Sequence, residues 1–214
     1  MYADILQRHH SETAALARTL RWRDAHRYLT TEIPVLLRPW LLAEGSLTQF
    51  LIAASTGEFR VERVLQEWQR PTLSEARLLQ IDPGQHALIR EVILWGRGQP
   101  WVYARSVIPS GSLRGDLRRL RKLHNTSLGA LLFSYPQLQR TPFELAAIDA
   151  NALPSSLQSK TARLPPGTRL EANKKLWARR SRFSIDDRAL IVGEIFLDDF
   201  VEALTHMPAL RQLP

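Results

Sequence analysis

The chain has 214 residues, of which 44% are hydrophobic, and it contains no cysteine. This length and composition suit a globular chain with a buried core, and the missing cysteines exclude disulfides, thiolate metal sites and cysteine nucleophiles. The formal net charge of +8 favours anionic partners such as nucleic acid, a membrane surface or a small polyanionic substrate. No apolar run approaches the roughly 20 residues of a membrane helix, so we expect a cytoplasmic protein without stable membrane insertion.

The first quarter of the chain is predicted to be helical. Residues 1–28 carry loosely spaced apolar residues among many polar ones, which predicts an N-terminal helical extension to a domain that spans 29–214. Two short helices are expected in the segment that follows Pro34. Gly45 would separate them, and Ser46 would cap the second.

Strands are predicted where apolar and polar residues alternate. This alternation indicates one strand after Gly57, a hairpin over 87–109 and a second hairpin over 176–197. Strands that arrive in hairpins, without βαβ alternation, indicate an α+β fold. We therefore expect a single antiparallel sheet of about six strands with flanking helices.

The remaining segments are predicted to be short helices and one long loop. Helices are expected over 113–123 and 128–133, between the two hairpins. Residues 149–172 are rich in proline and serine and poor in large apolar residues. Long irregular segments are uncommon inside a packed domain, so we interpret 149–172 as a flexible insertion.

Two charged residues interrupt apolar strand faces. Arg90 lies between Leu88 and Val92 on one face of the first hairpin, and Glu194 follows Val192 on a face of the second. A buried charge is costly unless an opposite charge meets it. One interpretation is that the two residues pair with each other, or lie on exposed faces. The other is an apolar pocket in which Arg90 binds a carboxylate and Glu194 transfers a proton.

Other kinds of site have little support in the sequence. None of the six histidines has a second ligand at helical spacing, so no metal site is expected. Glycine-rich phosphate loops, dinucleotide fingerprints and serine elbows are also missing, and no cofactor is predicted. The basic segments 114–122 and 174–182 lack the aromatic-basic pattern of RNA-binding modules, so solvated surfaces are favoured over nucleic-acid binding. Arg105 has no assigned role.

Several blocks of the sequence resemble the chorismate pyruvate-lyase family, whose members make 4-hydroxybenzoate for ubiquinone synthesis. The resemblance runs from about residue 40 to about residue 200 and is interrupted by the predicted insertion. The blocks are GSLTQFL (45–51), LIREVILW (88–95), WVYARSVIP (101–109), TSLGALLF (126–133), LWARRSRF (176–183) and GEIFL (193–197).

This resemblance implies a cofactor-independent elimination of pyruvate from chorismate, the first committed step of ubiquinone biosynthesis, in an enclosed ligand pocket. It gives Arg90 the carboxylate-binding role, Glu194 the acid–base role, and Leu47 and Leu128 places in the pocket wall. The family often has methionine where this chain has Leu47, and that exchange keeps shape and apolarity. We expect a monomer. The alternatives are a non-enzymatic small-acid-binding module of the transcription-regulator effector type, and a related lyase that yields another hydroxybenzoate.

Overall fold

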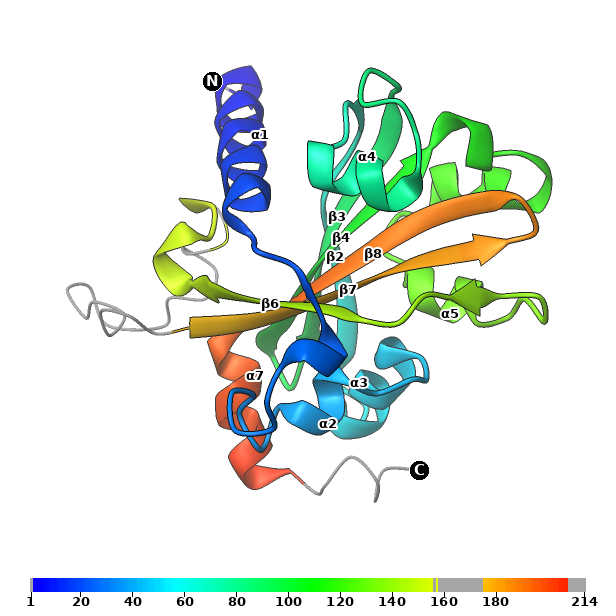
Figure 1. Cartoon of the computed structure of the whole chain (residues 1–214). Helices are drawn as coiled ribbons and strands as arrows, with labels where there is room; N and C mark the ends of the chain where they lie inside the picture. Colours follow the sequence, from blue (N-terminus) through cyan, green and yellow to red (C-terminus); the bar gives the residue numbers. More distant parts are fainter. Residues whose placement is uncertain (1, 156, 158–174, 208–214) are drawn as a thin grey trace.

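The computed structural model describes residues 2–155, 157 and 175–207. A single antiparallel sheet runs through it in the order β1-β6-β7-β8-β4-β3-β2, with β5 paired to the same edge of β7 as β6. Helices pack on this sheet (Figure 1). The α+β class and the single antiparallel sheet are confirmed.

The sheet has eight strands, where the sequence predicted about six. Two of the additional strands have only two residues each, which is too short for an alternating pattern to be recognised. The strands are β1 (Arg23–Asp24), β2 (Phe59–Gln69), β3 (Ala87–Gly96), β4 (Gln99–Pro109), β5 (Gln139–Arg140), β6 (Glu144–Asp149), β7 (Lys175–Ile185) and β8 (Arg188–Phe196).

Several helices begin at a side-chain cap, and the one predicted at Ser46 is among them. Ser46 and Ser127 each accept a backbone N–H of the helix that they precede, and Thr72 and Glu75 form a capping box. The α-helices are α1 (Tyr2–Thr19), α2 (Arg38–Leu41), α3 (Leu47–Ser55), α4 (Leu73–Leu79), α5 (Leu128–Leu132) and α7 (Asp198–Ala203). The 3-10 segments are η1 (Ala25–Arg27), η2 (Ser110–Ser112), η3 (Gly115–Lys122), η4 (Ala150–Ala152) and η5 (Leu204–His206).

The segment predicted as a helix over 113–123 is the 3-10 segment η3. Its buried residues, Leu117 and Leu120, are three positions apart, which places them on one face of a helix with three residues per turn. Most of the predicted insertion at 149–172 lies outside the described residues. The division into a 1–28 extension and a 29–214 domain stays a prediction, although β1 pairs with β6 inside the sheet.

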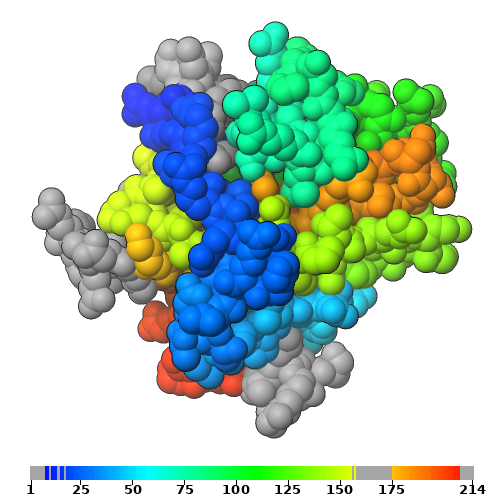
Figure 2. All heavy atoms as spheres, viewed as in Figure 1, coloured from blue at the N-terminus to red at the C-terminus, as the bar shows by residue number. Residues whose placement is uncertain are grey.

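The sheet buries apolar residues on both faces. On one face, here called the front face, α2, α3 and α7 pack around Trp40 and Phe200, while η3 and α5 pack around Leu117 and Leu132. On the back face, Leu16 of α1 and Leu79 of α4 contact the sheet. Figure 1 shows α1 and α4 above the sheet and α2, α3 and α7 below it. In Figure 2 the blue chain that follows α1 covers the middle of the visible surface.

Candidate active site

A cavity on the front face contains all four residues that the sequence predicted for a site. It lies between the sheet and the helices α3 and α5, and it holds about 610 Å³ of empty space, open solvent included. Leu47 and Leu128 are the first residues of these two helices, and both are buried in the cavity wall. The wall is mainly apolar and further includes Val92, Leu94, Ala104, Leu132, Phe133, Phe143, Phe183 and Val192.

The helices α3 and α5 meet across the cavity. The hydroxyl oxygens of Thr48 and Ser127 lie 2.6 Å apart and share a buried hydrogen bond. Gly129 permits this approach, because a Cβ at that position would lie 3.0 Å from Thr48 Oγ1. The two helix starts are therefore joined to each other over this part of the sheet.

Arg90 projects from β3 into this cavity and is 1% exposed. Its guanidinium donates to the carbonyl oxygens of Leu123 (3.4 Å), His124 (3.2 Å) and Thr126 (2.7 Å), in the loop before α5. Burial, together with the positive charge of Arg63, lowers the pKa of Arg90 to about 10, so the side chain stays cationic at neutral pH. Among the described residues, no carboxylate lies within ion-pairing distance of it. A buried cation in this state is a binding group for an anion.

Glu194 projects from β8 into the same cavity, and its ion-pair partner is Arg179 of β7. Arg179 Nε donates to Glu194 Oε2 over 2.6 Å, and the two side chains form a charge-assisted hydrogen bond. Arg179 Nη1 donates to the carbonyl oxygens of Trp40 (2.7 Å) and Ala43 (3.1 Å), at the end of α2. The interpretation that Arg90 and Glu194 pair with each other is therefore wrong.

The strand register fixes the separation of Arg90 and Glu194. Arg90 pairs with Ser106 of β4, and Glu194 pairs with Ala104 on the other side of β4. Two strand spacings are about 10 Å, and the two residues are also offset along the strands. The two side chains therefore enter the cavity from different strands at separate positions.

Two charged residues of the cavity wall, Arg179 and Arg140, were not predicted from the sequence. Arg179 lies in the block 176–183, and alternation from Phe183 would place it on the same face of the strand. Its pairing with Glu194, however, depends on the register of β7 against β8. Arg140 belongs to the two-residue strand β5, which leaves no pattern to recognise.

Arg105, which had no assigned role, points to the back face. Its guanidinium donates to Glu75 of α4 over 2.8 Å and to Glu91 of β3 over 2.6 Å. His9 of α1 is 2.6 Å from the second oxygen of Glu91. Burial alone would raise the pKa of both carboxyls, but Arg105, and for Glu91 also the hydrogen bond from His9, hold each pKa below its usual range. Arg105 therefore joins α1 and α4 to the sheet.

An Arg105→Gln variant should lose roughly 3–5 kcal/mol of unfolding free energy at pH 7, because two buried carboxylates lose their cation. In the native protein the pKa of Glu75 and of Glu91 is lowered by folding. Their stabilising contribution is thus present above the unfolded pKa of about 4.3 and is lost as the pH falls further. Urea unfolding followed by circular dichroism should show a deficit of the variant that is present at pH 5 and shrinks as the pH falls from 5 to 3.

The exposed Arg77 of α4 provides the control for this prediction. Arg77→Gln should unfold like the parent protein at each of these pH values, because the side chain is solvated. An Arg105→Gln protein as stable as its parent at pH 7 would contradict the structural role of this network.

Two classes of feature are not found within the part of the chain that the structure describes. No group of three or more His, Asp or Glu side chains gathers where it could hold a metal ion. In the same residues, no helix is long and apolar enough to cross a bilayer.

Comparisons with known proteins point to one family. A family model described as chorismate lyase matches residues 16–202. A probable chorismate pyruvate-lyase of Pseudomonas aeruginosa (strain UCBPP-PA14) is 39% identical over 158 residues, which cover 74% of this chain and 81% of the relative. One from Marinobacter nauticus is 41% identical over 160 residues, 75% of each chain. One from Aromatoleum aromaticum is 37% identical over 176 residues, 81% of this chain and 90% of the relative.

Solved structures of regulator domains are more distant. The effector domain of PhnF from Mycobacterium smegmatis gives a TM-score of 0.48 at 19% identity, covering 72% of this chain and 90% of that chain. This similarity is too low to indicate a function. The family match and the relatives decide the assignment, and the chain belongs to the chorismate lyase family.

Proposed function

We propose that this chain is a chorismate pyruvate-lyase, which eliminates pyruvate from chorismate and releases 4-hydroxybenzoate. The observation that carries the proposal is the largely apolar cavity, in which the buried Arg90 has no carboxylate within ion-pairing distance among the described residues and Glu194 pairs with Arg179. Membership of the chorismate lyase family supports it. We expect the protein to act as a monomer in the cytoplasm, in the first committed step of ubiquinone biosynthesis.

Arg90 binds the ring carboxylate of chorismate in this proposal. Its Nε and Nη2 donate to loop carbonyls, whereas no described residue accepts a hydrogen bond from Nη1. A carboxylate that reaches Nη1 completes the hydrogen bonding of a buried cation, in a site where charge-assisted bonds are strong. Leu47 and Leu128 pack against the ring and keep water away from it.

Glu194 handles the proton. The hydrogen on the hydroxyl-bearing carbon leaves as a proton, and its electron pair forms the last double bond of the aromatic ring. The bond between the neighbouring ring carbon and the ether oxygen breaks, and its electron pair leaves with the enolpyruvyl group, which takes up a proton and becomes pyruvate. Aromatisation drives the reaction, and no oxidant or reductant is needed. The protein contributes orientation, charge placement and exclusion of water.

The test is product analysis with purified protein and chorismate, in buffer with a chelator and no added cofactor. We expect 4-hydroxybenzoate, measured by chromatography, and pyruvate, measured by reduction with lactate dehydrogenase, in equal amounts and well above a heat-inactivated blank. Formation of 3-hydroxybenzoate would instead identify the related lyase. Tight binding of 4-hydroxybenzoate without any turnover would identify the small-acid-binding module.

A further inference from the structure

We propose that Arg140 binds the second carboxylate of chorismate, the one that leaves with pyruvate. This inference rests on the proposed function and adds a substrate-binding residue to the same cavity. Its basis is the position of Arg140, the position of its guanidinium and the charge balance of the cavity wall.

Arg140 lies on the cavity wall opposite Arg90. β5 pairs with β7, and Arg140 is the register partner of Phe183, which also lines the cavity. From β3 the sheet continues through β4, β8 and β7, and β5 follows beyond β7. Arg90 and Arg140 therefore reach into the cavity from opposite sides, and a ligand between them can meet both.

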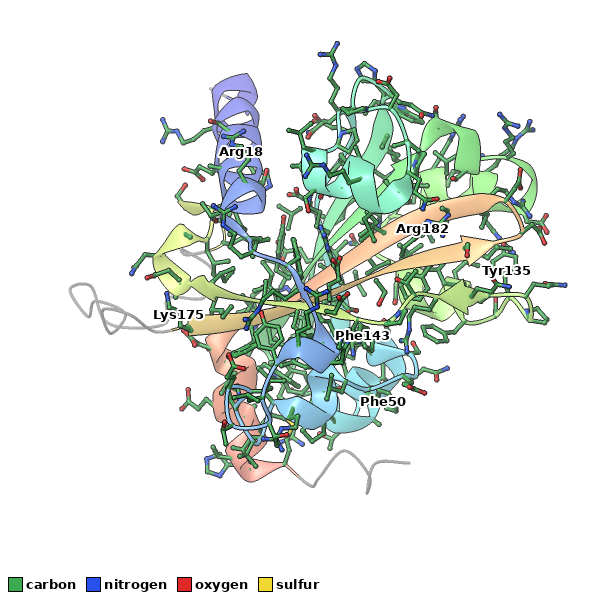
Figure 3. All side chains as sticks on the ribbon, viewed as in Figure 1. Arg18, Phe50, Tyr135, Phe143, Lys175 and Arg182 are labelled. Atoms are coloured by element: carbon green, nitrogen blue, oxygen red, sulfur yellow. The ribbon has the colours of Figure 1, made fainter. Side chains whose placement is uncertain are left out.

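The guanidinium of Arg140 lies at the end of the cavity that contains Glu194. Its central carbon is 4.3 Å from the centre of the Phe143 ring, and that of Arg179 is 4.5 Å from the same ring centre. Phe143 lies near the middle of the molecule, below β6 and β7 (Figure 3). The two arginines are thus close neighbours around one ring. Arg140 is placed where the bond to the enolpyruvyl group would break.

The charges of the cavity wall are unequal. Three arginines and one glutamate line it, and Glu194 balances Arg179. The positive charges of Arg90 and Arg140 are not paired, since neither side chain has a carboxylate within ion-pairing distance among the described residues. Burial and the positive charge of Arg179 lower the pKa of Arg140, and the nearby Glu44 and Glu194 oppose this shift. Two uncompensated cations match a substrate with two carboxylates.

Arg140 also borders an open groove outside the cavity, next to Glu44 and Phe133. It is half-buried, so its side chain faces both the ligand space and the outside. A cation at this boundary meets the dianionic substrate as it enters. It also meets the carboxylate of pyruvate, which is the smaller product and leaves from the same end.

The two carboxylates give the proposal a direct test, because 4-hydroxybenzoate retains only the ring carboxylate. Arg140→Gln should lower kcat/KM for chorismate by at least about 10-fold, mainly through a higher KM, because a charge-assisted contact to the substrate is lost. The inhibition constant of 4-hydroxybenzoate should change by less than about 2-fold. Arg140→Lys keeps the charge without the planar fork, and its kcat/KM should lie between those of the parent and Arg140→Gln.

Arg118→Gln is the matched control, because Arg118 is exposed on η3 and does not line the cavity. It should leave both constants unchanged. The inference is overturned if Arg140→Gln weakens substrate and product equally, or affects neither, while the parent enzyme is active. If Arg140→Gln unfolds, the same comparison made with Arg140→Lys decides. A parent protein that does not convert chorismate would instead refute the proposed function.

Discussion

Arg90→Ala should lower kcat/KM for chorismate by at least about 100-fold and should weaken inhibition by 4-hydroxybenzoate by a similar factor. Both ligands carry the ring carboxylate that Arg90 is proposed to bind, so both should lose the same contact. Steady-state kinetics with chorismate, together with calorimetric titration of 4-hydroxybenzoate, measures the two effects. This parallel loss contrasts with the selective loss expected at Arg140.

The variant has a structural effect that must be measured separately. Arg90 donates to the carbonyls of Leu123, His124 and Thr126, so its removal also loosens the loop that leads into α5. Arg90→Lys retains the cation and should restore part of the affinity. Arg70→Ala, at an exposed position after β2, controls for loss of surface charge and should behave like the parent. Unchanged binding of 4-hydroxybenzoate to a folded Arg90→Ala protein would exclude the proposed binding of the ring carboxylate by Arg90.

Glu194→Gln should lower the rate of the chemical step by at least about 100-fold while KM changes little. The amide has nearly the shape of the carboxylate but does not accept a proton at neutral pH. Single-turnover experiments with enzyme in excess are the appropriate measurement, because slow product release then does not mask the chemistry. The ratio of 4-hydroxybenzoate to pyruvate should stay at one.

Glu202→Gln, at an exposed position of α7, is the control and should turn over like the parent. A Glu194→Gln enzyme with the parental single-turnover rate would show that the proton moves within the substrate. Such a result would also exclude a required negative charge at this position, and the role of Glu194 would be limited to shape and hydrogen bonding. The thermal unfolding of both variants should be measured as well. The amide of Glu194→Gln leaves the buried Arg179 without its carboxylate, which can lower the stability of that variant.

The two hairpins could be predicted from sequence because each has long strands around a turn. β3 and β4 join through a short turn, and β7 and β8 join through Asp186 and Asp187. Each of these strands is long enough for the alternation of apolar and polar residues to be recognised. β5 and β6 were not predicted, since β5 has two residues and neither face of β6 is uniformly apolar. Their pairing with β7 depends on contacts between distant parts of the chain.

The residues of the candidate site could also be predicted only where their sequence pattern is local. Arg90 and Glu194 stand out because each is a charge on an otherwise apolar strand face, and that pattern is local. Arg179 and Arg140 do not stand out, because arginines are common in this basic chain and their places depend on register. Arg105 shows the converse case. It lies in a similar apolar strand, yet its carboxylate partners come from other strands and helices, so no local pattern distinguishes a structural from a substrate-binding arginine.

The contacts of Arg179 connect the backbone before α3 to Glu194. One nitrogen of its guanidinium binds Glu194, and another binds the carbonyl oxygens of Trp40 and Ala43, just before the helix that starts at Leu47. Because one side chain holds both, we expect a change in the backbone before α3 to alter the position of the Glu194 carboxylate as well.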